Sequence, residues 1–344
     1  MTKIEGPARS DLLKASDAEI EDAVTYADAM ALRGLLYQLT GDEELKDVTL
    51  KTVLGGYLER KVLGTEEDVA MVRRKAVDFL KAYRDAGAGP IDIGPRDRLP
   101  ISLGLMRGET IPEESLGLYI EETALDPWVR SLKWRETPDP EKLENFHVVI
   151  VGAGMGGLVS ALHLKRAGIP YTVIEKNAGV GGTWYENRYP GSRLDSPSRS
   201  YTHLFGVDFP YANPFSPWAE NQRYFSWVAD FFDLRKDMMF ETEVHSLTWD
   251  EATSKWEIVM TDKEGERKVM HANAVMTSVG FLNRPRLPDI EGRETFGGEA
   301  WHTVEWPDHA SIKDKRVAVI GTGATGYQTV PEMALEAKHV TVFQ

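Results

Sequence analysis

The sequence predicts an α/β protein with two dinucleotide-binding (Rossmann-like) folds, an antiparallel meander between them and an α-helical domain in front. A strand, a glycine-rich turn and a helix follow one another twice, as VVIVGAGMGG (148–157) and VAVIGTGATG (317–326), 169 residues apart. The residues before the first repeat have apolar positions at helical spacing and carry no chemical motif. A chain of 344 residues is also long for one core, because a domain holds roughly 150 residues.

The N-terminal domain, which we place at residues 1–140, is predicted to be helical. Ser16 with Glu19 and Thr65 with Asp68 are capping-box pairs, and each pair opens an apolar pattern of helical period. We interpret this region as an accessory domain that packs on a neighbour or on a second subunit, so a homodimer through these helices is one expectation.

The first glycine turn lies between a predicted strand and a predicted helix, and this context distinguishes it from an ordinary turn. Gly152 permits the tight turn, Gly154 lets the backbone approach a pyrophosphate, and Gly157 lets the helix pack on the strand. Glu175 lies 23 residues after Gly152, at the end of the second strand, where it can accept hydrogen bonds from both ribose hydroxyls of an adenosine.

The second repeat places Gly321, Gly323 and Gly326 in the same roles, and Gln344 stands where Glu175 stands in the first. A carboxylate there would repel a 2′-phosphate, whereas a neutral amide tolerates one, so this site is predicted to favour NADP over NAD. The first site, with its acid, thus suits a nucleotide with free ribose hydroxyls, and the second suits one with a 2′-phosphate. This pair of sites implies hydride transfer from NADPH to bound FAD. The intervening residues assigned to the second site are Thr322, Ala324 and Thr325.

Between the repeats, three short apolar segments are separated by turns that contain Asp, Ser and Gly. Residues 243–249, 256–261 and 267–276 are each predicted to form one strand. Together they predict an antiparallel meander.

Composition excludes several classes of protein. The 40 basic and 54 acidic residues give a net charge of −14, which repels nucleic acid and anionic lipid surfaces. The absence of cysteine excludes a cysteine-ligated metal and a disulfide reductase built on the same two-nucleotide plan. Residues 1–14 lack the apolar stretch of a signal peptide, and no apolar run approaches the ~20 residues of a membrane span, so a cytoplasmic location is expected.

Two longer stretches resemble the signatures of the Baeyer–Villiger monooxygenases, a branch of the flavin monooxygenases. They are GGTWYENRYPGSRLD (181–195) and FGGEAWHTVEWP (296–307), and the resemblance extends over residues 148–344. The helical leader is similar to that of the hydroxyacetophenone-type members. The positions that match the signatures are Trp184, Tyr189, Pro190, Gly191 and Asp195 in the first stretch and Phe296, Gly298, His302, Trp306 and Pro307 in the second.

The resemblance also implies site residues. Asp195 would pair with an arginine that supports negative charge on the oxygen-bearing flavin, and that arginine is expected beyond Gln344. His302, assigned to the catalytic set, would act with Trp306 in a linker that couples domain movement rather than transfer a proton. No second ligand stands at metal spacing from His302, so no metal is expected. The implied FAD contacts are Gly156, Glu175, Gly182, Thr183, Trp184, Tyr185, Glu186, Asp195, Tyr201 and Val244, and the implied nicotinamide-nucleotide contacts are Arg193, Leu194 and Asp195.

The implied activity uses FAD, NADPH and O2 to insert oxygen beside the carbonyl group of a small ketone, giving an ester or lactone. The chain would then comprise the first part of an FAD domain (141–295), a linker (296–312) and the start of an NADP domain (313–344), and it is expected to be a fragment. Two alternatives stay open: oxygenation of amines or sulfides, against which Trp306 and Pro307 argue, and a fragment that binds FAD without activity. Relatives often have tryptophan at Glu186 and cysteine near Leu194, so substrate preference does not follow from the resemblance.

Overall fold

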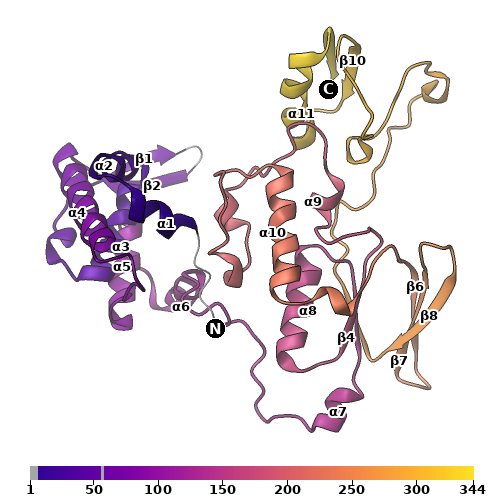
Figure 1. Ribbon diagram of the computed structural model, residues 1–344, viewed down its shortest axis with the longest axis horizontal. Helices are drawn as coiled ribbons and strands as arrows, with labels where there is room; N and C mark the ends of the chain where they lie inside the picture. Colours follow the sequence, from indigo (N-terminus) through magenta and orange to yellow (C-terminus); the bar gives the residue numbers. More distant parts are fainter. Residues whose placement is uncertain (1–6, 56–57) are drawn as a thin grey trace. The chain divides into compact units, whose positions relative to one another are not determined.

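The computed structural model describes residues 7–55 and 58–344, which divide into two compact units (Figure 1). The first unit contains the described residues of Met1–Val129 together with Val207–Pro210, and the second contains Arg130–Gly206 and Tyr211–Gln344. The beginning of the charged leader, residues 1–6, lies outside the described residues.

The first unit is built mainly of helices around one hydrophobic core. The Ser16 capping box is confirmed, because its hydroxyl accepts from the Glu19 N–H and the Glu19 carboxylate accepts from the Ser16 N–H. Thr65 caps its helix in the same way, although the Asp68 carboxylate binds the Thr65 hydroxyl instead of the Thr65 N–H. The core includes Leu36, Leu45, Val72 and Ala76. The helices are α1 (Pro7–Lys14), α2 (Asp17–Tyr26), α3 (Ala29–Thr40), α4 (Glu66–Asp85), α5 (Leu99–Arg107) and α6 (Glu113–Glu122), with short 3-10 helices at Glu43–Lys46 and Arg96–Arg98.

The expectation of an all-helical leader is wrong between α3 and α4, where β1 (Leu50–Gly55) and β2 (Leu58–Leu63) form an antiparallel hairpin. Strand-favouring Thr52 and Val53 lie in β1, and the Lys61 ammonium donates to the Thr52 hydroxyl across the pair. Leu63 is buried in the helical core and anchors the hairpin there.

The second unit contains a parallel sheet in the order β5-β4-β3-β9, and the predicted strand–turn–helix–strand arrangement is confirmed at its centre. The apolar run that enters the first glycine turn is buried throughout Val148, Val149 and Ile150, as expected of a central parallel strand. The elements are β3 (Val148–Val151), α8 (Met155–Ala167), β4 (Tyr171–Ile174), β5 (Met238–Met239) and β9 (Ala274–Thr277).

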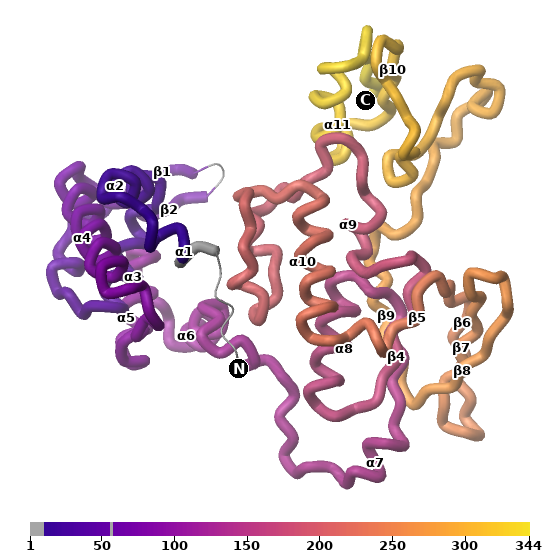
Figure 2. The backbone as a smooth tube through the Cα atoms, in the orientation of Figure 1, coloured from indigo at the N-terminus to yellow at the C-terminus, as the bar shows by residue number. Residues whose placement is uncertain are grey.

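The predicted meander is confirmed as β6 (Glu243–Asp250), β7 (Lys255–Thr261) and β8 (Arg267–Ala272), three antiparallel strands in that order. Figure 2 shows it beside the parallel sheet. Ile258 of the meander shares a hydrophobic core with Val149 of β3. The meander therefore packs against the sheet that carries the first glycine turn.

The third predicted strand, 267–276, is wrong as a single element, because it divides at Asn273 into β8 and β9. The Asn273 N–H donates to the carbonyl of His147, and the Asn273 side-chain oxygen accepts from the His147 N–H. These bonds attach the chain to the residue before β3, so the following residues leave the meander and join the parallel sheet.

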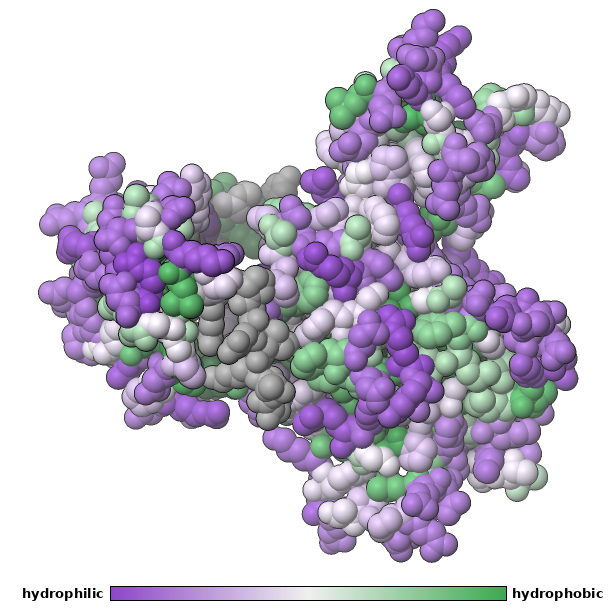
Figure 3. All heavy atoms as spheres, in the orientation of Figure 1, coloured by the Kyte–Doolittle hydropathy of each residue, from purple (hydrophilic) through white to green (hydrophobic). Residues whose placement is uncertain are grey.

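The second repeat also folds as predicted, with β10 and β11 parallel and α11 between them in the sequence. Its core contains Ile312, Val319 and Met333. On the face drawn in Figure 3, hydrophilic side chains predominate and hydrophobic ones form patches among them. In the described part of the chain, no helix has the length and apolar character needed to cross a membrane. The remaining elements are α7 (Pro140–Glu144), α9 (Thr183–Glu186), α10 (Trp218–Phe231), β10 (Arg316–Ile320), α11 (Ala324–Glu336) and β11 (His339–Phe343), with 3-10 helices at Ser198–Ser200, Leu204–Gly206, Arg235–Asp237, Arg293–Thr295 and Thr303–Glu305.

Candidate functional site

The first glycine turn joins β3 to α8 in a conformation that requires glycine. Gly152 has φ of +100°, and a Cβ atom there would lie 2.6 Å from the carbonyl oxygen of Ser278. A Cβ atom on Gly157 would overlap the carbonyl oxygen of Gly152. Helix α8 begins after Gly154 without a side-chain cap, so the N–H groups of its first turn are available to an anion such as a pyrophosphate.

A second glycine-containing loop packs on this turn. The Gly181 N–H donates to the carbonyl of Ala153 at 3.0 Å. A Cβ atom on Gly182 would lie 3.0 Å from the Cα atom of Gly154, so the two backbones touch with no side chain between them. The next helix, α9, carries the predicted residues Thr183, Trp184, Tyr185 and Glu186, and the Trp184 indole N–H donates to the Tyr201 hydroxyl at 3.2 Å.

Glu175 is buried beside the first turn, with 4% of its surface exposed. Its carboxylate accepts from the N–H groups of Ala153 at 2.7 Å and Asn177 at 2.8 Å. Burial raises the pKa of Glu175, although these two hydrogen bonds oppose that rise. Glu186 lies nearby, where the Asn177 amide donates to it and the Lys176 ammonium pairs with it at 2.8 Å.

His203, which no sequence motif marked, holds the start of α8. Its Nε2 lies 3.1 Å from the carbonyl oxygen of Met155, the first residue of the helix, and must carry the proton because that oxygen only accepts. Its Nδ1 then accepts from the Tyr224 hydroxyl at 2.8 Å. Burial lowers the pKa of His203 to about 4, so the imidazole is neutral at physiological pH.

Asp195 follows the second loop on a segment that also contains Arg193 and Leu194. Leu194 is buried, and its N–H donates to the carbonyl of Ser216 at 2.9 Å. The Asp195 side chain is exposed and has no hydrogen bond or ion pair to another residue that the structure describes. Arg193 is hydrogen-bonded through its main chain to Gln328 of α11, so the structure brings this segment to the second repeat.

The second glycine turn repeats the geometry of the first. Gly321 has φ of +111°, and its N–H donates to the carbonyl of Phe343 at 2.9 Å, as the Gly152 N–H does to Ile174 in the first repeat. A Cβ atom on Gly326 would lie 2.5 Å from the carbonyl oxygen of Gly321. Helix α11 starts after Gly323 without a side-chain cap. Thr322, Ala324 and Thr325 lie in this turn and the first residues of α11, and Gln344 directly follows β11.

His302 and Val244 lie outside these turns. The His302 ring caps the short 3-10 helix Thr303–Glu305, where its Nδ1 accepts from the Val304 N–H at 3.2 Å. Trp306 packs on the core of the second repeat, and Val244 packs between the meander and the parallel sheet. Across residues 7–55 and 58–344, no group of three or more His, Asp or Glu residues is arranged to hold a metal.

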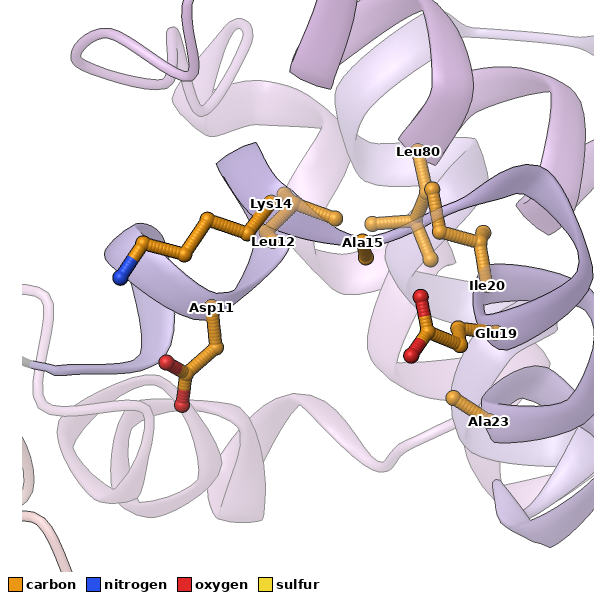
Figure 4. Close-up of a pocket in the computed structure, with 8 residues that line it drawn as sticks. All are labelled: Asp11, Leu12, Lys14, Ala15, Glu19, Ile20, Ala23 and Leu80. Atoms are coloured by element: carbon orange, nitrogen blue, oxygen red, sulfur yellow. The ribbon is translucent and has the colours of Figure 1, made fainter.

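A separate cavity of about 410 Å³ lies within the first unit (Figure 4). Its one glutamate, Glu19, is already engaged in the capping box at Ser16. The remaining lining side chains are mostly apolar, and the two other charged ones, Asp11 and Lys14, carry opposite charges. Its lining residues are Asp11, Leu12, Lys14, Ala15, Glu19, Ile20, Ala23 and Leu80.

Comparison with known proteins identifies the family. Residues 145–344 match the family model described as FMO-like, flavin-binding monooxygenase-like. The chain belongs to this family.

The relatives of this flavin-binding monooxygenase-like chain include a Baeyer–Villiger monooxygenase of Streptomyces coelicolor, 37% identical over 202 residues that cover 58% of this chain and 38% of the relative. An uncharacterized monooxygenase, y4iD of Sinorhizobium fredii, is 28% identical over 327 residues that cover 94% of this chain and 48% of the relative. The crystal structure of OTEMO in complex with FAD and NADP matches with a TM-score of 0.54 and 37% identity, over 57% of this chain and 38% of that one. The chain thus spans less than half of the length of each.

Two adjacent glycines of this flavin-binding monooxygenase-like chain should respond differently to alanine. Gly157→Ala should lower the free energy of unfolding by several kcal/mol, because the new methyl group overlaps the Gly152 carbonyl. Gly156→Ala should be neutral or stabilising by up to about 1 kcal/mol, because its nearest neighbour, the Ser278 hydroxyl, would be 3.5 Å away and alanine favours helix. Urea unfolding measures both, and equal effects would contradict the packing described at Gly157.

The low pKa of His203 should make folding sensitive to pH. The unfolded chain takes up a proton on this residue as the pH falls below about 6.5, whereas the folded chain does so near pH 4. The stability that the neutral imidazole contributes is therefore present above pH 6.5 and is lost between pH 6.5 and 4, by on the order of 3 kcal/mol. The measurement is the free energy of unfolding at each pH for wild type, His203→Gln and the exposed control His245→Gln. If the free energy of unfolding changes with pH equally in wild type and in His203→Gln, the assignment of this pH dependence to His203 is contradicted.

Proposed function

We propose that this chain forms the nucleotide-binding part of an FAD- and NADPH-dependent monooxygenase that inserts one oxygen atom of O2 beside the carbonyl of a small ketone. The observation that carries the proposal is the repeated glycine turn, bordered by a buried acid, Glu175, in the first repeat and followed by Gln344 in the second. The similarity to a Baeyer–Villiger monooxygenase and to an FAD–NADP complex supports it.

The first turn fits FAD. The free N–H groups at the start of α8 suit a pyrophosphate. Gly154 and Gly182 are both partly exposed and carry no side chain that would block a close approach. Glu175 keeps acceptor capacity on both oxygens beyond its two backbone hydrogen bonds, and we assign it to the ribose hydroxyls. When bound, FAD supplies the redox chemistry with O2.

The second turn fits NADP. Helix α11 also begins without a side-chain cap, and the residue after β11 is the neutral Gln344. Because the amide does not repel a 2′-phosphate, NADPH is the coenzyme we assign as hydride source. Arg193, Leu194 and Asp195 reach this repeat through Gln328, which supports their assignment to the nicotinamide nucleotide.

Asp195 and the linker select the reaction within the family. The exposed Asp195 carboxylate is free to pair with a cation, and in our proposal that cation stabilises negative charge during attack on the ketone carbonyl. The Trp306–Pro307 ending of the linker favours ketone oxygenation over oxygenation of amines or sulfides. His302 holds the turn that precedes Trp306, so its proposed role is to fix the linker.

We keep the division into 1–140, 141–295, 296–312 and 313–344 as the proposed domain organisation, with two dinucleotide-binding folds in the last 204 residues. A cytoplasmic location and a homodimer formed through the N-terminal helices stay predictions. Exposed Leu13, Tyr26 and Leu35 on these helices support self-association, and light scattering at several concentrations tests it.

Glu175→Ala should weaken FAD binding. The substitution removes a ribose acceptor and leaves the Ala153 N–H of the turn without its partner, so we expect the dissociation constant to rise about 10- to 100-fold, as for loss of a hydrogen bond to a charged group. Titration followed by flavin fluorescence measures the change. Glu257→Ala is the matched control, because this half-exposed glutamate lies on the central meander strand β7. Equal affinity of Glu175→Ala and wild type would remove Glu175 from the site.

The coenzyme preference should depend on Gln344. Wild type should bind NADP+ more tightly than NAD+, and Gln344→Glu should weaken NADP+ binding about tenfold or more while NAD+ affinity is kept, because the new carboxylate repels the 2′-phosphate. Calorimetric titration with both nucleotides measures this. An equal response of both nucleotides would contradict the assignment.

Product analysis separates the candidate reactions. The chain and the full product of its gene are supplied with FAD, NADPH and air together with cyclic and aryl ketones, a sulfide and an amine. Ester or lactone supports the proposal, whereas sulfoxide or N-oxide alone supports the alternative oxygenation. Bound flavin without any oxygenated product from either protein would reduce the function to nucleotide binding.

A further inference from the structure

One glutamine joins the segment that leads to Asp195 with the helix of the second repeat. The Gln328 side-chain oxygen accepts from the Tyr189 hydroxyl at 3.0 Å and from the Arg193 N–H at 3.2 Å. The Gln328 side-chain nitrogen donates to the Arg193 carbonyl at 2.9 Å. The Gln328 amide thus pairs with both the N–H and the carbonyl of Arg193, as a neighbouring strand would, and holds Arg193 against α11.

The backbone around this contact is packed closely. Gly191 has φ of +81°, and a Cβ atom there would overlap the carbonyl oxygen of Gln328 and come within 3.0 Å of the Glu332 side chain. Tyr189 is buried, with 6% of its surface exposed. The segment therefore meets α11 through both the side chain and the main chain of Gln328.

The other side of the same segment is bound to the start of α10. The Leu194 N–H donates to the Ser216 carbonyl at 2.9 Å, and the Trp218 N–H donates to the Ser192 carbonyl at 2.8 Å. Arg193 therefore lies between α10 of the first nucleotide fold and α11 of the second. Asp195 follows two residues later.

We propose that Gln328 is a positioning residue that holds the Asp195 segment on helix α11, so that the segment is already ordered when the second nucleotide binds. The identity of that nucleotide rests on the proposed function, whereas the positioning rests on the contacts of Gln328 alone. Without the amide, ordering of the segment would oppose binding, and nucleotide affinity would fall.

Hydrogen exchange of single amides tests the positioning directly. Gln328→Met removes the three hydrogen bonds at similar length, and Gln328→Glu keeps the two accepted bonds but cannot donate to the Arg193 carbonyl. The Arg193 amide should exchange at least tenfold faster in the Met variant and at an intermediate rate in the Glu variant. The Leu194 amide, bonded to Ser216, is the internal reference, and Tyr327→Phe at the exposed neighbouring position is the control. Unchanged exchange of Arg193 in the Met variant overturns the proposal.

Nucleotide titration tests the consequence. In Gln328→Met the dissociation constant for NADP+ should rise about tenfold, whereas that for FAD should change less than twofold, because Glu175 and the first turn do not contact Gln328. A parallel rise of both constants would indicate general loss of structure and would overturn the positioning role. If wild type binds neither nucleotide, the proposed function fails, and the exchange of Arg193 still decides whether Gln328 holds the segment.

Discussion

The close approach of helix α8 to the glycine turn before it is the constraint on which the first nucleotide fold depends. Gly157 lies against the carbonyl of Gly152, and Gly152 lies against the carbonyl of Ser278, which directly follows β9, the strand paired with β3. At these two positions the neighbouring backbone leaves no space for a Cβ atom. The start of α8 is thereby held at the end of β3, where its free N–H groups face a potential anion site.

The first glycine turn has no polar side chains of its own, and neighbouring polar side chains hold its main-chain groups. Glu175 accepts from the N–H of Ala153, and His203 donates to the carbonyl of Met155. Near the second site, the Gln328 amide both accepts from the Arg193 N–H and donates to the Arg193 carbonyl. Each of these side chains is at least partly buried, and in each case a main-chain group provides the hydrogen bond that a buried polar atom requires.

The linker adds a second kind of restraint, which is hydrophobic. Trp306 packs edge-on against Trp301 and against the core that contains Val319 and Met333. His302 caps the turn immediately before it. Within the family signature of this stretch, Trp306 is therefore the side chain that packs on the core of the second repeat, whereas Phe296 at its start is exposed.

The sequence by itself determined the two glycine turns, the acid at the end of β4 and the meander, because each depends on residues that are close together along the chain. The hairpin at Leu50–Leu63 was missed because its strands are short and mostly exposed, and the break at Asn273 was missed because it depends on His147, 126 residues away. Only the tertiary structure assigned His203 and Gln328. Their partners, Met155 and Arg193, lie 48 and 135 residues away, and contacts at such separations leave no periodic pattern in the sequence.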